Sequence, residues 1–198
     1  MPDSNRVFAG VLFFLGSAQF VTILMIGEAM APGYSISENA ISDLGVIGAT
    51  RALFNTSLFI IGLLIALGGY LFHRTHRKPW ITALFILAGI GTIGAGVFNL
   101  EYGIHGIFAL IAFLFVNLQA IGSATQIRGP LKTLSPILGI VGLVALGLMV
   151  AGDIGGIAAA FGPIGHGGTE RLIVYPGLLW LMAFGGYLMA SQALASKE

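Results

Sequence analysis

Two histidines and one aspartate are the residues of this chain best suited to acid–base chemistry. His105 lies in Tyr102-Gly-Ile-His-Gly106 and His166 in Gly162-Pro-Ile-Gly-His-Gly-Gly168. The glycines beside each imidazole allow a backbone or a ligand to approach closely. Because an imidazole titrates near neutral pH, a histidine beside a carboxylate can act as a general acid or base. We therefore predict His105, His166 and Asp43 as the catalytic residues of any enzyme built on this chain.

The same three side chains are candidate metal ligands, because zinc favours imidazole and carboxylate groups. No His-x-x-x-His or His-Glu-x-x-His spacing supports a specific zinc motif, so zinc stays an open alternative as cofactor. The chain has no cysteine, which excludes disulfides, thiolate metal sites and cysteine nucleophiles. In a third interpretation, both histidines cap helix ends and hydrogen-bond loop carbonyls.

The longest polar run of the chain is Gly33–Gly45, and two of its residues, Ser42 and Asn39, are candidate substrate-binding residues. The run lies between two apolar stretches and is rich in hydrogen-bonding side chains: Ser35, Ser37, Glu38, Asn39, Ser42 and Asp43. Its serines and Asp43 could equally serve as helix N-caps. Within it, Ile36, Ala40, Ile41 and Leu44 fall at roughly helical spacing, which predicts one buried face.

Further substrate-binding candidates lie near the ends of later apolar stretches: Asn99, Asp153, Glu170 and Arg171. Asp153 closes the fifth stretch, where a carboxylate meets the negative end of a helix and needs a compensating cation. Arg171 opens the sixth stretch at the positive end of its helix, where a cation is unfavourable. We therefore expect its side chain to turn inward toward a negative partner. There it would pair with Asp153 or Asp43, or hold an anionic ligand bidentately.

The composition indicates the kind of structure that positions these residues. The 198 residues are 57% hydrophobic and 9% charged, against about 25% charged in soluble domains, which excludes a soluble globular protein. A membrane-spanning helix needs roughly 20 apolar residues, and six stretches qualify: 7–30, 52–72, 80–99, 104–125, 134–153 and 171–193. Their short connections predict an all-α integral membrane protein, a compact bundle of six transmembrane helices forming one domain over 1–198.

The charges predict the orientation of this bundle in a cell membrane. One side collects seven cations, Arg6, Arg74, Arg77, Lys78, Arg128, Lys132 and Lys197, and the other has only Arg51 and Arg171. Lys and Arg in short loops favour the cytoplasm, so both termini are expected to be cytoplasmic. The carboxylates Glu28, Glu38, Asp43, Glu101, Asp153 and Glu170 fall on the outer side, leaving Asp3 and Glu198 inside. This second asymmetry predicts a polar site at the outer face.

Three motifs carry a resemblance to a known family. Ile-Ser-Asp-Leu-Gly at 41–45, the His-Gly opening of the fourth span and Gly-Thr-Glu-Arg at 168–171 resemble the six-helix archaeal and bacterial membrane proteins called domain of unknown function 998. The resemblance covers nearly the whole chain and implies a small membrane protein with six helices and no established activity. A looser likeness, around 36–45, is to the Frag1/DRAM-like membrane proteins, which are linked to lipid remodelling.

We therefore expect a pocket near the outer membrane face that binds or modifies a membrane lipid or small amphiphile. If the protein is an enzyme, hydrolysis or group transfer is the expected chemistry. The alternatives are a transporter or channel for a small solute or proton, using polar groups such as Gln19 and Asn117, and a non-catalytic scaffold. A net charge of +1 gives no indication of nucleic-acid binding. The many glycines allow tight packing within one chain or in a homo-oligomer.

Overall fold

Six long helices form the computed structural model, which describes residues 4–195, with side chains described as far as Ala190. They are α1 (Ser4–Met30), α2 (Arg51–His76), α3 (Pro79–Val97), α4 (His105–Ser123), α5 (Pro130–Asp153) and α6 (Gly165–Ala195). Three short 3₁₀ helices lie between them: η1 (Ile41–Gly45), η2 (Ala124–Gln126) and η3 (Ala158–Ile164). The described range contains no strand, and all six long helices are apolar and long enough to cross a membrane. The prediction of an all-helical chain with six helices long and apolar enough to cross a membrane is confirmed.

Four helices, α1, α2, α5 and α6, extend further than the apolar stretches that predict them, whereas α3 and α4 end two residues earlier than theirs. α6 begins at Gly165 and not at residue 171, and α2 continues through His76 into the basic connection. Apolar composition marks only the part of a helix that suits lipid, whereas the backbone hydrogen bonds continue into polar residues at its ends. Pro79 and Pro130 each stand at the start of a helix, where the missing N–H of proline costs nothing.

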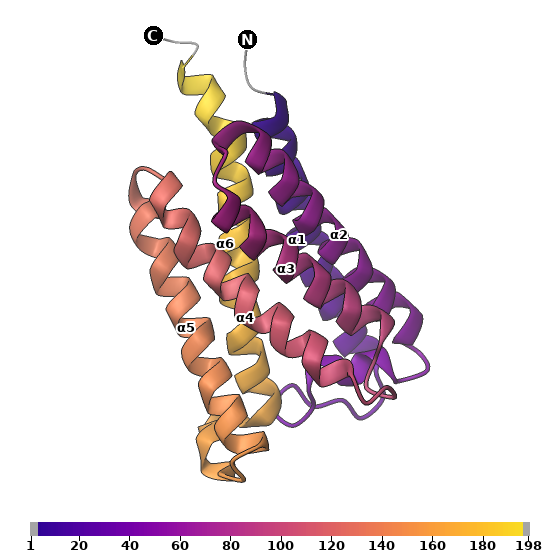
Figure 1. Cartoon of the computed structure of the whole chain (residues 1–198). Coiled ribbons are helices and arrows are strands. Elements are labelled where there is room, and N and C mark those ends of the chain that lie inside the picture. Colours follow the sequence, from indigo (N-terminus) through magenta and orange to yellow (C-terminus); the bar gives the residue numbers. More distant parts are fainter. Residues whose placement is uncertain (1–3, 196–198) are drawn as a thin grey trace.

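Each helix packs against its neighbours in the chain, and α6 returns to α1 to close the bundle (Figure 1). α6 also packs against α4, α5, η1 and η3. One end of the bundle carries both termini and the α2–α3 and α4–α5 connections. The opposite end carries the Gly33–Gly45 loop, the α3–α4 turn and the α5–α6 connection, and we call it the loop end.

Small residues bring α2 and α3 close together. A Cβ at Gly62 would lie 2.8 Å from the carbonyl oxygen of Gly89, and one at Gly89 would lie 2.7 Å from that of Gly62. Such contacts are closer than real Cβ atoms tolerate, so the two backbones cross where neither residue has a side chain. This is the packing by small residues that helices use in lipid.

An aromatic stack fills the bundle between α1, α3 and α6. Phe13 stacks on Phe85 at a centroid distance of 4.8 Å, and Trp180 stacks on Phe184 at 4.9 Å. All four side chains are fully buried. The Trp180 indole N–H donates to Ser135 Oγ at 2.8 Å, so the one polar atom of this stack has a partner. The core here is closed and well packed.

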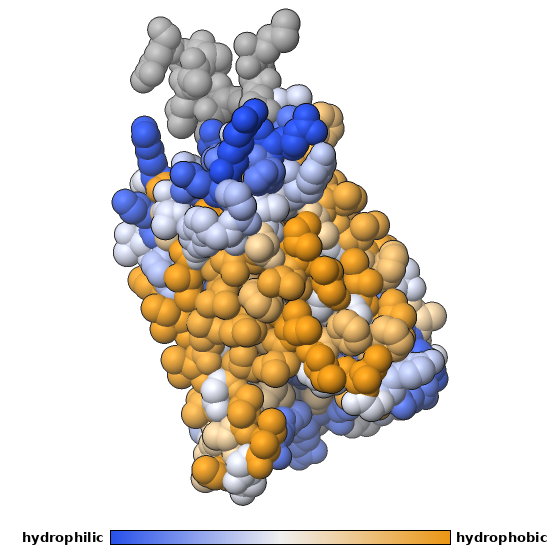
Figure 2. Space-filling view, viewed as in Figure 1, coloured by the Kyte–Doolittle hydropathy of each residue, from blue (hydrophilic) through white to orange (hydrophobic). Residues whose placement is uncertain are grey.

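Charges of opposite sign gather at opposite ends of the bundle. An apolar surface separates two hydrophilic ends (Figure 2). Among the described residues, six cations lie at the end with the termini: Arg6, Arg74, Arg77, Lys78, Arg128 and Lys132. All six described carboxylates belong to the loop end, together with Arg51 and Arg171. Asp3, Lys197 and Glu198, which the charge pattern assigns to the inner side, lie outside the described residues.

Candidate functional site

The Gly33–Gly45 loop folds over the loop end of the bundle and is held there by the start of α6. The backbone N–H of Gly167 donates to the carbonyl of Ser37 at 2.9 Å. Two residues of η1, Ile41 and Leu44, are buried as predicted, but Ile36 is 54% exposed. The helical spacing does not apply to Ile36, because the chain around it forms a turn and the helix begins only at Ile41.

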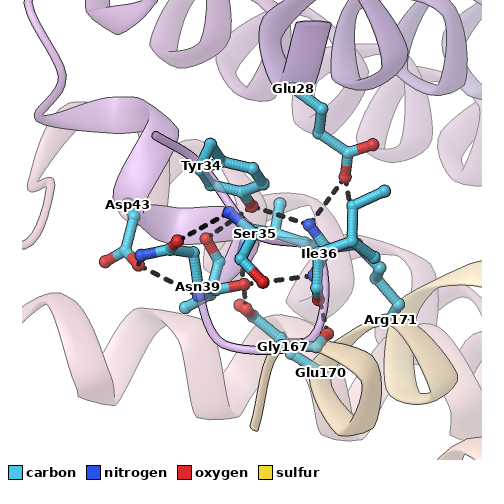
Figure 3. Close-up of polar contacts among 11 residues, drawn as sticks. Glu28, Tyr34, Ser35, Ile36, Asn39, Asp43, Gly167, Glu170 and Arg171 are labelled. Carbon is cyan, nitrogen blue, oxygen red and sulfur yellow. Dashed lines mark hydrogen bonds and ion pairs between the residues drawn. The ribbon is translucent and has the colours of Figure 1, made fainter. Parts of the chain in front are cut away.

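Arg171 holds this loop against α1. Its guanidinium donates from Nε and Nη2 to Glu28 Oε1 at 3.0 and 2.6 Å, and Nη1 donates to the carbonyls of Ile36 and Asn39 at 2.9 and 3.2 Å. The expected pairing with Asp153 or Asp43 is therefore wrong, and the partner is Glu28 (Figure 3). The inward turn of Arg171 is confirmed, since the residue is 5% exposed.

Tyr34 completes the network around Arg171. Its hydroxyl donates to the carbonyl of Ala40 at 2.8 Å and accepts from Arg171 Nη2 at 2.6 Å. Burial raises the pKa of Tyr34 to about 12, although the positive charge of Arg171 works in the opposite direction. The phenol therefore stays neutral at physiological pH, which keeps its proton on the bond to Ala40.

The sequence analysis missed Tyr34 and the role of Glu28. Glu28 stands in the last turns of α1, where a carboxylate meets the negative end of the helix and needs a nearby cation. The same reasoning drew attention to Asp153, and it would have predicted a cation for Glu28. Nothing in the sequence pattern indicates Tyr34.

Glu170 points to a different part of the loop from its neighbour Arg171. Its carboxylate accepts the backbone N–H of Ile41 on Oε2 and the hydroxyl of Ser42 on Oε1, the latter at 3.3 Å. Glu170 is 3% exposed, and none of the ion pairs found among the described residues includes it. A carboxyl group is thus buried at the base of the loop, with a backbone amide and a hydroxyl as its hydrogen-bonding partners.

His105 joins the same cluster through Ser42. Its Nε2 lies 3.2 Å from Ser42 Oγ, and its Nδ1 lies 2.7 Å from the carbonyl oxygen of Phe98. A carbonyl only accepts hydrogen bonds, so Nδ1 carries the proton, and Nε2 of the neutral ring can accept the Ser42 proton when that hydroxyl turns from Glu170. The hydroxyl of Ser42 therefore lies between an imidazole nitrogen and a carboxyl group.

This cluster stands at one end of an apolar cavity of about 60 Å³ within the bundle. Ser42, Glu170 and Thr92 are the polar residues of its wall, and the Thr92 hydroxyl is already bonded to the carbonyl of Ala88. The rest of the wall is apolar, from Ile41, Phe20, Phe54, Leu58, Ile61, Ile65, Ala95, Ala109, Ala112, Phe113, Val116, Val174 and Leu178. The cavity is thus a hydrocarbon-lined space with its hydrogen-bonding groups concentrated at Ser42 and Glu170.

The remaining candidates in and near the loop serve its structure. Asp43 Oδ2 accepts the N–H of Ala40 at 3.0 Å and the side-chain amide of Asn39 at 3.1 Å. Asn39 Oδ1 accepts the N–H of Ser35 at 2.9 Å. Asn99 donates to the carbonyl of Gly45 at 3.3 Å and accepts the N–H of Glu101 at 3.0 Å. These bonds fix the turns of the loop end, and none of the three side chains lines the cavity.

His166 is separate from the cluster around Ser42. Its Nε2 lies 3.2 Å from Asp153 Oδ1, and both side chains are partly exposed. His166 is thus a hydrogen-bonding partner of the carboxylate at the end of α5. In the described part of the chain, no three His, Asp or Glu side chains gather closely enough to hold a metal ion. The trio His105, His166 and Asp43 therefore does not fit a zinc site.

Gln19 and Asn117, the amides considered for a transport path, each bond to a neighbouring helix. Gln19 on α1 accepts from the Ser57 hydroxyl of α2 at 2.8 Å and donates to the Ser57 carbonyl at 3.2 Å. Asn117 on α4 donates to the carbonyl of Ile173 on α6 at 3.1 Å. Hydrogen bonds of this kind join helices in membrane bundles.

Comparison with known proteins gives one match. No curated protein and no solved structure matches the chain, and these comparisons show no likeness to the Frag1/DRAM-like proteins. The family model described as "Protein of unknown function (DUF998)" matches residues 14–187, from the first helix to the last. The six apolar helices and this match indicate a multi-pass membrane protein. The chain belongs to the DUF998 family.

Proposed function

We propose that this protein crosses the membrane six times and binds a lipid or similar amphiphile, with a hydrocarbon chain in the cavity and the polar group at Ser42. The observation that carries this proposal is the cavity, which is apolar along its length and has Ser42 and Glu170 at one end. A hydrocarbon chain suits the walls, and a polar group entering at the cluster finds hydrogen-bonding partners there.

The length of the cavity supports an occupant from a single leaflet. Its wall runs along α2 from Phe54 to Ile65, which is about 16 Å at 1.5 Å per residue. The hydrocarbon core of a bilayer is about 30 Å thick, so the cavity spans roughly half of it. A chain in this space would extend from the loop end toward the middle of the membrane. Each buried CH₂ would contribute about 0.8 kcal/mol.

In this proposal the loop end faces outward and both termini are cytoplasmic. The support is the concentration of cations at the terminal end, which is the pattern of cytoplasmic loops. Because the chain has no cysteine, single cysteines can test this cleanly. A membrane-impermeant maleimide added to intact cells should label Ser37→Cys, which is exposed at the loop end, and not Thr133→Cys at the start of α5. The reverse pattern would overturn the orientation.

Photocrosslinking tests the occupant. The protein is reconstituted in nanodiscs with a phospholipid that carries a diazirine in its acyl chain, and crosslinked residues are identified by mass spectrometry. Phe54, Ile61 and Leu178 are at most 3% exposed and line the cavity, so they can be reached only from within it. We expect crosslinks at these positions. Crosslinks confined to outward-facing residues such as Ile107 would contradict the proposal.

A matched pair of variants on α4 provides the control. Ala109→Phe places a large ring in the cavity wall, whereas Leu110→Phe changes the adjacent, 48% exposed residue. The first should reduce crosslinking at Phe54, Ile61 and Leu178, and the second should leave it unchanged. Equal effects of both variants would show that the cavity is not the binding site.

A further inference from the structure

We propose that Ser42 is a nucleophile that takes the acyl group from a lipid ester or amide, with His105 as its general base. This inference rests on the proposed function, because the cavity must first hold the acyl chain. It goes further by naming the reaction, the attacking atom and the class of substrate, a carboxylic acyl lipid.

The geometry around Ser42 contains the parts that an activated serine requires. A nucleophile is recognised by a base within about 2.6–3.2 Å, itself oriented by a third group. Ser42 Oγ lies 3.2 Å from His105 Nε2, and the Phe98 carbonyl at 2.7 Å from Nδ1 fixes the ring and its tautomer. The three residues come from η1, the start of α4 and the end of α3, and His105 is 6% exposed.

The position of Ser42 in the cavity determines which bond it can reach. Ser42 belongs to the wall, and His105 stands behind it and does not line the cavity. The Oγ atom can therefore face an occupant. Its proton, which Ser42 donates to Glu170 Oε1 at 3.3 Å in the structure, must turn toward His105 Nε2, 3.2 Å from Oγ, for the attack. The carbonyl of an acyl lipid lies where its hydrocarbon chain meets its polar group. With the chain in the apolar cavity, that carbonyl would be at the polar end, next to Oγ.

The reaction balances without a metal or redox partner. Oγ attacks the acyl carbon, and the Ser42 proton moves to His105 Nε2. The bond from the acyl carbon to the headgroup oxygen or nitrogen then breaks, and that atom takes the proton from Nε2. The result is an acyl-serine and a free headgroup alcohol or amine. Water, deprotonated by the same nitrogen, then attacks the acyl-serine, which releases a fatty acid and restores the Ser42 hydroxyl.

Glu170 is a positioning residue in this scheme. It accepts the Ile41 N–H next to Ser42 on Oε2 and the Ser42 hydroxyl at 3.3 Å on Oε1. It thereby holds η1 so that the hydroxyl lies near the imidazole. In the structure its carboxylate accepts the Ser42 proton, so the roles of His105 and Glu170 must be separated by experiment.

The test is covalent labelling with a long-chain alkyl fluorophosphonate in nanodiscs. Attack by Oγ on phosphorus expels fluoride and adds a stable mass, and peptide mass spectrometry identifies the labelled residue. We expect one label per chain, on Ser42. Ser42→Ala should abolish labelling, whereas Ser37→Ala, an exposed serine in the same loop, should leave it unchanged. Labelling of any other residue, or none at all, would overturn the assignment of Ser42.

Two further variants decide which group is the base. General-base catalysis contributes about 10²–10⁴-fold, so His105→Ala should slow labelling by at least about 100-fold. Glu170→Gln keeps an oxygen that can accept the Ile41 N–H, and it should slow labelling less than about tenfold. The opposite order would overturn the role of His105. Rescue of His105→Ala by added imidazole would distinguish loss of the base from loss of folding, and absence of rescue in a folded variant would count against the base.

The photocrosslinking experiment separates this inference from the proposed function. Crosslinks within the cavity without phosphonate labelling would overturn the nucleophile and leave lipid binding intact. If neither crosslinks nor labelling occur, the proposed function fails and this inference fails with it.

Discussion

Arg171 and Glu28 join the start of α6 to the end of α1 through two hydrogen bonds to one carboxylate oxygen. The side chains are 6% and 12% exposed, respectively, so the pair is buried. A second ion pair at the same end of the bundle, between Arg51 and Glu101, has exposures of 44% and 50%. Both are arginine–glutamate pairs, one buried and one exposed, so removing each arginine in turn measures how much burial changes the contribution of the pair to stability.

Arg171→Met should be strongly destabilising. Removing one member of a buried pair leaves the other charge without compensation, at a cost of about 3–5 kcal/mol. The Ile36 and Asn39 carbonyls also lose their donor. The free energy of unfolding, measured by denaturant titration in mixed micelles, would show this loss. Arg51→Met should cost at most about 1 kcal/mol, because exposed pairs contribute little. Similar losses in both variants would contradict the role assigned to Arg171.

Tyr34 predicts a dependence of stability on alkaline pH. Its pKa is raised from 10.0 to about 12 in the folded protein, mainly by burial. Below pH 10 the phenol is protonated in both states, so its contribution is fully present. Between about pH 10 and pH 12 the unfolded chain loses this proton more readily than the folded protein, so stability falls as the pH rises. The groups with which Tyr34 interacts electrostatically are Arg171, Glu28 and Glu170.

Tyr34→Phe isolates this contribution. The variant loses the bonds to Ala40 and Arg171, which should cost about 1–3 kcal/mol at neutral pH. The difference in unfolding free energy between wild type and variant should then shrink from pH 10 to pH 12. A difference that stays constant over this range would show that the titration of Tyr34 is not linked to folding.

The helices could be predicted from the sequence, but the attachment of the loop to α6 could not. Each span follows from the length of its apolar run, and the separation of charges between the two ends follows from which connections carry them. The loop, in contrast, is held mainly by the backbone carbonyls of Ile36, Ser37 and Asn39. Every residue has a carbonyl, so no side-chain pattern marks the ones that Arg171 and Gly167 contact.

The cluster around Ser42 was predicted only in part. His105 and Ser42 were both candidates, but 63 positions separate them, and only the packing of η1 against the start of α4 brings them together. Asp43, His105 and His166 were grouped because their residue types suit one reaction. In the structure, Asp43 stabilises a turn and His166 pairs with Asp153, so residue type alone does not distinguish a structural role from a catalytic one.

Gly167→Ala should detach the loop from α6. A Cβ at this position would collide with the carbonyl oxygens of Asn39 and Ile36, which are the same atoms that Arg171 binds. Because these neighbours are backbone, the loop must shift. Limited proteolysis of the Gly33–Gly45 loop should become faster. Gly186→Ala on the same helix, where a Cβ would meet open space, is the control and should leave proteolysis unchanged. If the Gly33–Gly45 loop of Gly167→Ala resists proteolysis as well as that of the wild type, the close contact at Gly167 is not needed to hold the loop.

Single substitutions of the three candidate catalytic residues should differ sharply in lipid turnover by reconstituted vesicles. His105→Ala should lower turnover by at least about 100-fold, because it removes the only imidazole that contacts Ser42 among the described residues. His166→Ala should leave turnover unchanged, since this partly exposed side chain contacts Asp153 at the surface. Asp43→Ala should lower stability by about 0.5–1.5 kcal/mol for each hydrogen bond lost, to the Ala40 N–H and the Asn39 amide, with turnover per folded protein retained.

The ranking of these three variants discriminates between two arrangements of the site. If turnover depends on His166 as strongly as on His105, the two imidazoles act together, and the α5–α6 connection must move toward Ser42 during the reaction. If only His105 matters, catalysis is confined to the end of the cavity, because that is where an imidazole, a hydroxyl and an apolar wall meet. Turnover that survives all three substitutions would leave the cavity as a binding site and assign no chemistry to it.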